Sequence, residues 1–189
     1  MSPKEAYAKA RGAADRALKI DPQLALAHRV FASQELVGWA LFSADRLPEA
    51  EAAFRSLLEL NPSYAGAHCE LSEVLLAERK TDAALAISRD ESDEAARTFC
   101  MADALWVLGQ RPEATALLTE GQAKYGSARA YNIAESYALR DQKDEAFKWL
   151  DRAYENREAQ ITMFRSDPSL RGLRADPRFT ALGQKMHLL

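Results

Sequence analysis

The chain has 189 residues and a net charge of −3, with 48% hydrophobic and 28% charged residues. Ala and Leu dominate, which favours helix throughout, and no Lys/Arg stripe marks a nucleic-acid-binding face. No apolar run has the length of a membrane span, and the N-terminus MSPKEAYAKA lacks the apolar core of a signal peptide. We therefore expect a cytoplasmic helical protein that binds neither nucleic acid nor membrane.

Helix-like segments follow one another with a recurring alanine. The segments PEAEAAF, DAALAI, PEATALL and DEAFKWL carry it at Ala50, Ala84, Ala114 and Ala146, at spacings of 34, 30 and 32 residues. Small residues at a period near 34 are typical of stacked helix-turn-helix units, and the pattern resembles the tetratricopeptide repeat. It predicts an all-α, right-handed superhelix of this type. In chain order we expect half a repeat at 3–22, repeats at about 23–62, 63–92, 93–126 and 127–157, and a helical C-terminal cap at 158–189.

Residues 3–22 have the pattern of a second helix with no first helix ahead of it. Because an array rarely begins halfway through a unit, two explanations stay open. Either the chain is part of a longer protein, or a second copy supplies the missing helix in a homodimer. In both cases the face that carries Ala10, Ala14 and Leu18 is expected to contact the first full repeat.

Small residues are expected where the two helices of a repeat meet, because they allow close approach. In the first helices the register assigns this position to Ala32, Ser72, Ala102 and Ala134, each preceded by a large apolar residue: Phe31, Leu71, Met101 and Ile133. In the second helices the third small position falls on Ala17, Gly121 and Ala153. Leu57 and Glu91 break the pattern, so their repeats are expected to pack less typically.

Two segments depart from the period. Pro22 and Pro62 are 40 residues apart, and the excess around VGWALFSAD predicts a longer first helix or turn, with Trp39 and Phe42 exposed. After Ala84 the segment ISRDESDE is four residues short, which predicts a truncated second helix followed by a turn and a new helix start at 90–94.

The repeat pattern stops after Arg157. Asp167-Pro168 and Asp176-Pro177 are typical helix starts, since Asp caps a helix and Pro is preset for its first position. An apolar stripe follows that is expected to cover the last repeat: Leu170, Leu173, Phe179, Leu182 and Met186.

The C-terminal part carries a further resemblance. The run ARAYNIAESYALRDQKDEAFKWLDRAYENRE, followed by DPSLRGLRADPRFTALGQKM, resembles the end of bacterial tetratricopeptide proteins of the adenylate cyclase-like and transcriptional-activator-like kinds. In these proteins such a region follows a cyclase or winged-helix domain. The match is strongest over 128–186 and implies a regulatory or sensory module of a signalling protein. Neither a cyclase nor a winged-helix motif is present, so neither activity is implied.

The cysteine and histidine residues are expected to have packing roles and not catalytic or metal-binding ones. Cys69 and Cys100 lie in apolar stretches without metal spacing, and we expect buried free thiols in a reducing compartment, with a disulfide as the alternative. His28 and His68 share one repeat position, which favours a packing role over zinc binding. No phosphate loop, nucleophile elbow or metal motif occurs in the sequence. We therefore predict no catalytic residue, no cofactor and no metal.

A binding surface is the stronger expectation, because solenoids bind partners on a concave face, which the first helices line in this type of array. The register places there Arg29, Ser33, Cys69, Glu70, Glu73, Phe99, Asp103, Trp106, Tyr131, Asn132 and Glu135. Aromatic residues mixed with carboxylates favour a groove for a neutral to basic protein or peptide segment; a plain polar surface is the alternative. A Lys/Asn/Arg clamp for a C-terminal carboxylate is disfavoured. Self-assembly is the main rival function, and an unrecognised enzyme or small-molecule receptor is a more distant one.

Overall fold

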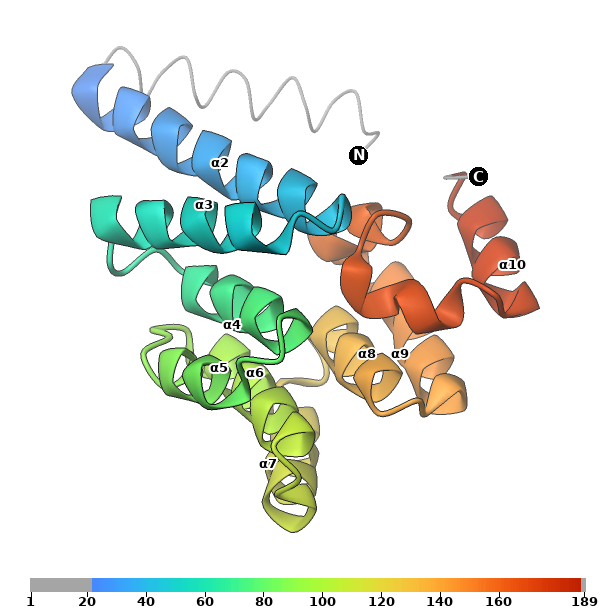
Figure 1. Cartoon of the computed structure of the whole chain (residues 1–189). Coiled ribbons are helices and arrows are strands. Elements are labelled where there is room, and N and C mark those ends of the chain that lie inside the picture. The colour runs from blue at the N-terminus through green and yellow to red at the C-terminus, as the bar shows by residue number, and fades with distance from the viewer. Residues whose placement is uncertain (1–21, 188–189) are drawn as a thin grey trace.

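The fold is a row of antiparallel helix pairs (Figure 1). A computed structural model describes residues 22–187, with side chains described from residue 31 onward. The pairs are α2 (Pro22–Ser43) with α3 (Leu47–Leu60), α4 (Ala67–Ala77) with α5 (Thr81–Ser88), α6 (Glu94–Val107) with α7 (Arg111–Tyr125), and α8 (Ala130–Leu139) with α9 (Lys143–Asn156). The chain ends with two 3-10 helices, η1 (Ala159–Met163) and η2 (Pro168–Leu173), and with α10 (Pro177–Lys185).

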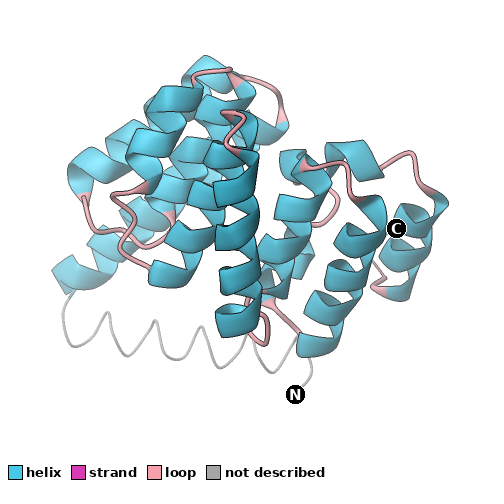
Figure 2. Cartoon of the chain, turned by 90° about the horizontal axis from the view of Figure 1, so that it is seen from below, coloured by secondary structure: helices cyan, strands magenta, loops and turns pink. Residues whose placement is uncertain are grey.

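Short loops join the helices, and no strand occurs between residues 22 and 187 (Figure 2). In that range no helix combines the length and the apolar character needed to cross a membrane. The half repeat predicted at 3–22, with Ala10, Ala14, Ala17 and Leu18, lies outside the described residues, except that Pro22 begins α2.

The turn inside each helix pair has the same backbone geometry. One residue has a left-handed conformation, at Asp45, Arg79, Gly109 and Asp141. The amide of the residue that follows donates a hydrogen bond to the carbonyl five residues earlier, for example Arg46 N to Leu41 O at 2.9 Å. This bond satisfies a carbonyl group in the last turn of the first helix. Each left-handed residue lies five positions before one of the recurring alanines. The spacing of the alanines therefore equals the spacing of the turns inside the helix pairs. The all-α tetratricopeptide-type solenoid with a helical C-terminal cap is confirmed.

The small positions are buried where the helices of a pair meet. All four recurring alanines, together with Ser72, Ala102 and Ala134, have no exposed surface, as predicted. Ala32 is exposed, so its assignment was wrong. The close contact falls six residues later, at the buried Gly38, where an added Cβ would lie 2.7 Å from Phe54 Cζ. The six extra residues of this repeat therefore precede the contact.

The two irregular segments have the helix lengths that the sequence predicts, but the burial of one side chain differs from the prediction. Helix α2 is long, with 22 residues, and α5 is truncated to 8 residues. Asp93 caps α6 by accepting a hydrogen bond from Ala96 N at 2.9 Å. The predicted exposure of Phe42 is wrong, because this ring is 4% exposed, and Trp39 is half-buried between Phe42 and Phe54.

The two pattern-breaking residues are both buried. Leu57 is fully buried in the core of the first pairs. Glu91 is 1% exposed, and its carboxylate accepts hydrogen bonds from Gly66 N at 3.1 Å and Asp93 N at 2.9 Å. A buried carboxylate satisfied by backbone amides joins the loop before α4 to the loop before α6.

Cys69 on α4 and Cys100 on α6 form a disulfide, with their Cα atoms 5.5 Å apart. The expectation of free thiols is therefore wrong. Stacking places the first helices of neighbouring repeats side by side, and this brings together two cysteines that are 31 residues apart in sequence.

The C-terminal segment covers the last repeat and also turns back along the array. As predicted, Asp167 and Asp176 cap η2 and α10, and four residues of the apolar stripe are buried: Leu170, Leu173, Phe179 and Leu182. Helix α10 contacts α9, whereas η2 packs against α8. Arg171 on η2 reaches Asp45 in the turn between α2 and α3. The segment therefore lies over part of the concave face.

Candidate binding site on the concave face

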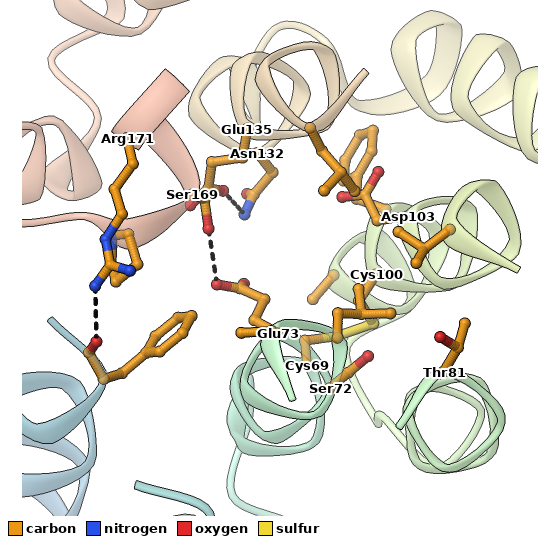
Figure 3. A pocket seen from close by; sticks show the side chains of 18 of the residues that line it. Cys69, Ser72, Glu73, Thr81, Cys100, Asp103, Asn132, Glu135, Ser169 and Arg171 are labelled. Carbon is orange, nitrogen blue, oxygen red and sulfur yellow. Dashed lines mark hydrogen bonds between the residues drawn. A yellow bond between two sulfur atoms is a disulfide. The ribbon is translucent and has the colours of Figure 1, made fainter. Parts of the chain in front are cut away.

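Two adjoining cavities lie between the first helices and the C-terminal segment. The smaller has a volume of about 550 Å³ and the larger about 930 Å³. Both are lined by Glu73 of α4 and by Asn132 and Glu135 of α8. We call these three residues the junction site. Figure 3 shows Glu73 on one side of the smaller cavity and Asn132 with Glu135 on the opposite side.

Carboxyl groups from separate elements converge on the cavities. Glu70 lines the larger one, Asp103 of α6 the smaller one, and Asp167 enters the larger one from the loop before η2. Glu73 accepts a hydrogen bond from Ser169 Oγ at 3.3 Å, and Glu135 accepts one from Asn132 Nδ2 at 3.2 Å (Figure 3). Over the described residues neither glutamate forms an ion pair with a Lys or Arg side chain. The junction site therefore holds two uncompensated acids.

Desolvation and mutual repulsion disfavour the charged form of these acids. Burial, followed by the charges of Asp167 and Glu70, raises the pKa of Glu73 well above its usual range. Burial, followed by Asp167 and Glu73, does the same to the pKa of Glu135. Burial is also the main cause that raises the pKa of Glu70 to about 8. A cation in the cavities would favour the charged form of all three.

Asp103 differs from these acids because it has a cation. Arg140 Nη1 donates to Asp103 Oδ1 at 2.5 Å, and Ser136 Oγ donates to Oδ2 at 2.9 Å. Arg140 is itself buried and also donates to the carbonyl of Ala102 at 3.1 Å. The pair joins α6 to the end of α8, and Asp103 lines the smaller cavity.

Two buried acceptor atoms at the cavities have no hydrogen-bond partner: Oε2 of Glu70 and Oδ1 of Asn132. Buried polar atoms are normally satisfied, so an unsatisfied acceptor in a cavity calls for a donor. The other oxygen of Glu70 accepts from Trp39 Nε1 at 3.0 Å. Among the described residues no group of three or more His, Cys, Asp or Glu could hold a metal ion.

Apolar side chains border the same cavities. Five large apolar residues are exposed among the described side chains, and three of them line a cavity: Leu36 at 69%, Val107 at 40% and Leu139 at 42% exposure. Exposed apolar surface beside polar groups is typical of a binding site.

The three predicted aromatic residues do not offer an accessible surface in the cavities. Tyr131 lines the larger cavity and Phe99 the smaller one, but both side chains are buried in the walls, and Trp106 lies elsewhere. Tyr131 is 2% exposed and donates to Asp167 Oδ2 at 2.7 Å, because the C-terminal segment covers it. Phe99 is 3% exposed and packs against Gly121, where an added Cβ would lie 2.7 Å from Phe99 Cε1. Trp106 is half-buried, lines neither cavity, and lies beneath the guanidinium groups of Arg111 and Arg140.

The remaining predicted residues are distributed as follows. Glu70, Glu73, Asp103, Asn132 and Glu135 line the cavities, and so does Cys69, whereas Ser33 is exposed and lines neither. The side chain of Arg29 lies outside the described part of the chain. The structure adds residues that the repeat register did not select: Glu35, Trp39, Asp167, Ser169 and Arg171. Three of these belong to the C-terminal segment, for which the sequence indicated only a cap.

Comparison with known proteins identifies no family for the chain. No family model and no curated protein matches it. Among solved structures it is similar to YrrB, described as a tetratricopeptide-repeat protein with an unusual peptide-binding site. The identity is 18% and the TM-score 0.42, over 92% of this chain and 98% of that chain. At that level neither a shared family nor a shared binding site follows.

Proposed function

We propose that this chain is a protein-interaction module that holds a neutral to basic segment of a partner protein on its concave face, by binding and not by catalysis. The observation that carries the proposal is the junction site, where the half-buried Glu73 and Glu135 lie on opposite sides of the smaller cavity and neither is paired with a Lys or Arg of the described residues. Withdrawing carboxylates from water without a cation costs free energy. Such groups are concentrated at functional sites.

The composition of the cavities supports a protein segment as the ligand. Apolar side chains at their borders match the apolar parts of a peptide, and the unsatisfied acceptors match its N–H donors. Interfaces commonly combine an apolar centre with a few placed polar groups.

The experiment is a selection of random short peptides against the purified chain, followed by calorimetric titration of the peptides obtained. Glu135→Lys places a positive charge at the junction site, whereas Glu113→Lys makes the same charge change at an exposed position of α7. We expect the first variant to weaken binding at least about tenfold, as loss of a charge-assisted contact implies. The second should bind like the wild type. Equal affinity for both variants would place the site elsewhere.

We further propose that the module is the regulatory or sensory part of a larger bacterial signalling protein in the cytoplasm. The resemblance over residues 128–186 supports this context. Disulfides are rare in the cytoplasm, so the bond between Cys69 and Cys100 weighs against this location and makes it testable. Alkylation of thiols in intact cells should label both cysteines if the protein is cytoplasmic. Two unlabelled cysteines would argue for an oxidising compartment.

Homodimerisation through the half repeat expected at residues 3–22 is the second candidate. Val37 on α2 and Leu60 at the end of α3 are 45% and 54% exposed and line neither cavity. Both residues belong to the repeat that follows this half repeat in sequence, and their exposure favours an additional apolar contact there. Sedimentation equilibrium distinguishes the candidates: a dimer that Val37→Lys converts to a monomer supports self-assembly, and a monomer at every concentration contradicts it.

A further inference from the structure

We propose that the junction site is a pocket for one basic side chain, Arg or Lys, of the partner segment, with Glu73, Glu135 and the amide oxygen of Asn132 as its acceptors. This inference rests on the proposed function and adds the chemistry of the anchor residue.

The acceptors stand on facing walls. Glu73 projects from α4 and Glu135 from α8, with Asn132 one turn before Glu135 on the same helix (Figure 3). Ser169 Oγ donates to Glu73 at 3.3 Å and Asn132 Nδ2 donates to Glu135 at 3.2 Å. The carboxyl group of Glu135 also lies in hydrogen-bond contact with Asp167, and Asn132 Oδ1 has no partner. A guanidinium offers five N–H donors and an ammonium three, so either can satisfy several acceptors at once.

The cavity walls beside the acceptors are apolar and can contact the methylene groups of such a side chain. Lys and Arg bury their methylene groups along apolar surface and extend the charge to polar partners. The smaller cavity offers this surface on Phe42, Leu76, Ala77, Val107, Leu139 and Pro168. With about 550 Å³ the cavity also has room for residues that flank the anchor.

The charges around the site favour a cation from outside the chain. Of the cations that line the cavities, Arg129 is paired with Asp93 and Arg171 with Asp45. Arg79, exposed in the turn after α4, also lines the smaller cavity and forms no ion pair with Glu73 or Glu135, and Arg140 is paired with Asp103. A basic side chain between Glu73 and Glu135 would replace carboxylate repulsion by attraction in a region of low dielectric constant, where charges interact strongly.

The test is a two-dimensional ¹H–¹⁵N NMR titration of the full chain with two capped tripeptides, Ala-Arg-Ala and Ala-citrulline-Ala. Citrulline has the shape of arginine without its charge. We expect saturable shifts at the Asn132 side-chain amide and at the backbone amides of Glu73 and Glu135. Binding of the citrulline peptide should be about tenfold weaker or more. An Ala-Lys-Ala peptide should shift the same resonances.

Two variants with matched charge provide the control. Glu73→Gln/Glu135→Gln should abolish the arginine-dependent shifts. Glu113→Gln/Glu120→Gln, at exposed positions of α7, should retain them. Competition by millimolar Ca²⁺ or Mg²⁺ at constant ionic strength would instead identify a metal site and overturn the inference.

The outcomes separate the two proposals. If peptides from the selection bind the concave face but keep their affinity when each Arg or Lys is replaced by a neutral residue, the anchor inference is wrong and the proposed function stands. If these peptides bind equally to Glu135→Lys and to the wild type, the proposed function itself is wrong. Equal shifts from the arginine and citrulline peptides also overturn the inference.

Discussion

Arg171 on η2 donates a hydrogen bond from Nη1 to Asp45 Oδ1 at 2.8 Å, across 126 residues of sequence. Its other terminal nitrogen lies 3.4 Å from the carbonyl oxygens of Phe42 and Ser43. The C-terminal segment thereby contacts the first turn of the described array, and a guanidinium lies at the border of the smaller cavity (Figure 3).

Removing this cation should strengthen the binding of a basic peptide. Arg171→Ala leaves the junction site intact and takes away a like charge that an incoming Arg or Lys must approach. Since the ion pair with Asp45 is exposed, the free energy of unfolding should change by no more than about 1 kcal/mol. Calorimetric titration and urea denaturation measure the two effects. Arg178→Ala on α10 is the control, and weaker binding by Arg171→Ala would contradict the expectation.

The acid at Glu70 should make stability depend on pH. Its folded-state pKa of about 8 lies above the ordinary value of 4.5, so its contribution to stability is full below about pH 4.5 and is lost as the pH rises through about 8. The groups that face it are Trp39 and Glu35 of α2, Tyr64 before α4, Glu73 of α4 and Glu91 before α6.

Glu70→Gln should therefore flatten the fall in stability between about pH 4.5 and 8, because Gln stays neutral. Urea denaturation across this range measures the difference from the wild type. Glu59→Gln, at an exposed position of α3, should leave the profile unchanged. A profile of Glu70→Gln that is parallel to the wild type would show that this carboxyl titrates normally.

Tyr131→Phe should destabilise the chain by about 1–3 kcal/mol, because it leaves the buried Asp167 without its hydroxyl donor. The repeat register predicts Tyr131 on the concave binding surface, whereas the structure buries it against Asp167. Denaturation at neutral pH measures the change. Stability equal to the wild type would indicate that Tyr131 is accessible after all.

Reduction of the disulfide between Cys69 and Cys100 should destabilise the chain by about 3–4 kcal/mol, the chain-entropy value for a loop of this length. The melting temperature with and without reductant gives the effect, and Cys69→Ala/Cys100→Ala should match the reduced protein. Detection of two free thiols in the unfolded, unreduced protein would disprove the bond.

Ala134→Leu should cost about 1–3 kcal/mol through overpacking, since Ala134 is fully buried opposite the equally buried Ala146. Thermal unfolding detects such a change readily. An unchanged melting temperature would be inconsistent with the packing of α8 on α9.

The sequence predicted most of the fold because the repeat period records a local feature, the left-handed turn five residues before each recurring alanine. Its failure at Ala32 has a definite cause. The spacing predicts the excess length of the first repeat, but the period alone does not say on which side of the helix contact the extra residues lie. The close contact at Gly38 shows that they precede it.

The site was partly predictable for a related reason. Glu73, Asn132 and Glu135 follow from the register of the first helices, which needs only the period. Tyr131 shares that register but is covered by Asp167, and the return of η2 across the face depends on tertiary contacts that no periodic pattern records. The pairing of Cys69 with Cys100 likewise depends on which helices stack side by side.

The most direct measurement is a crystal structure of the full chain with the tightest peptide from the selection. We predict that the peptide lies on the concave face between α4 and α8, with a basic side chain in contact with Glu73 and Glu135. A peptide bound instead to the outer face formed by α3, α5 and α7, with the two cavities empty, would contradict the assignment of the concave face as the binding surface.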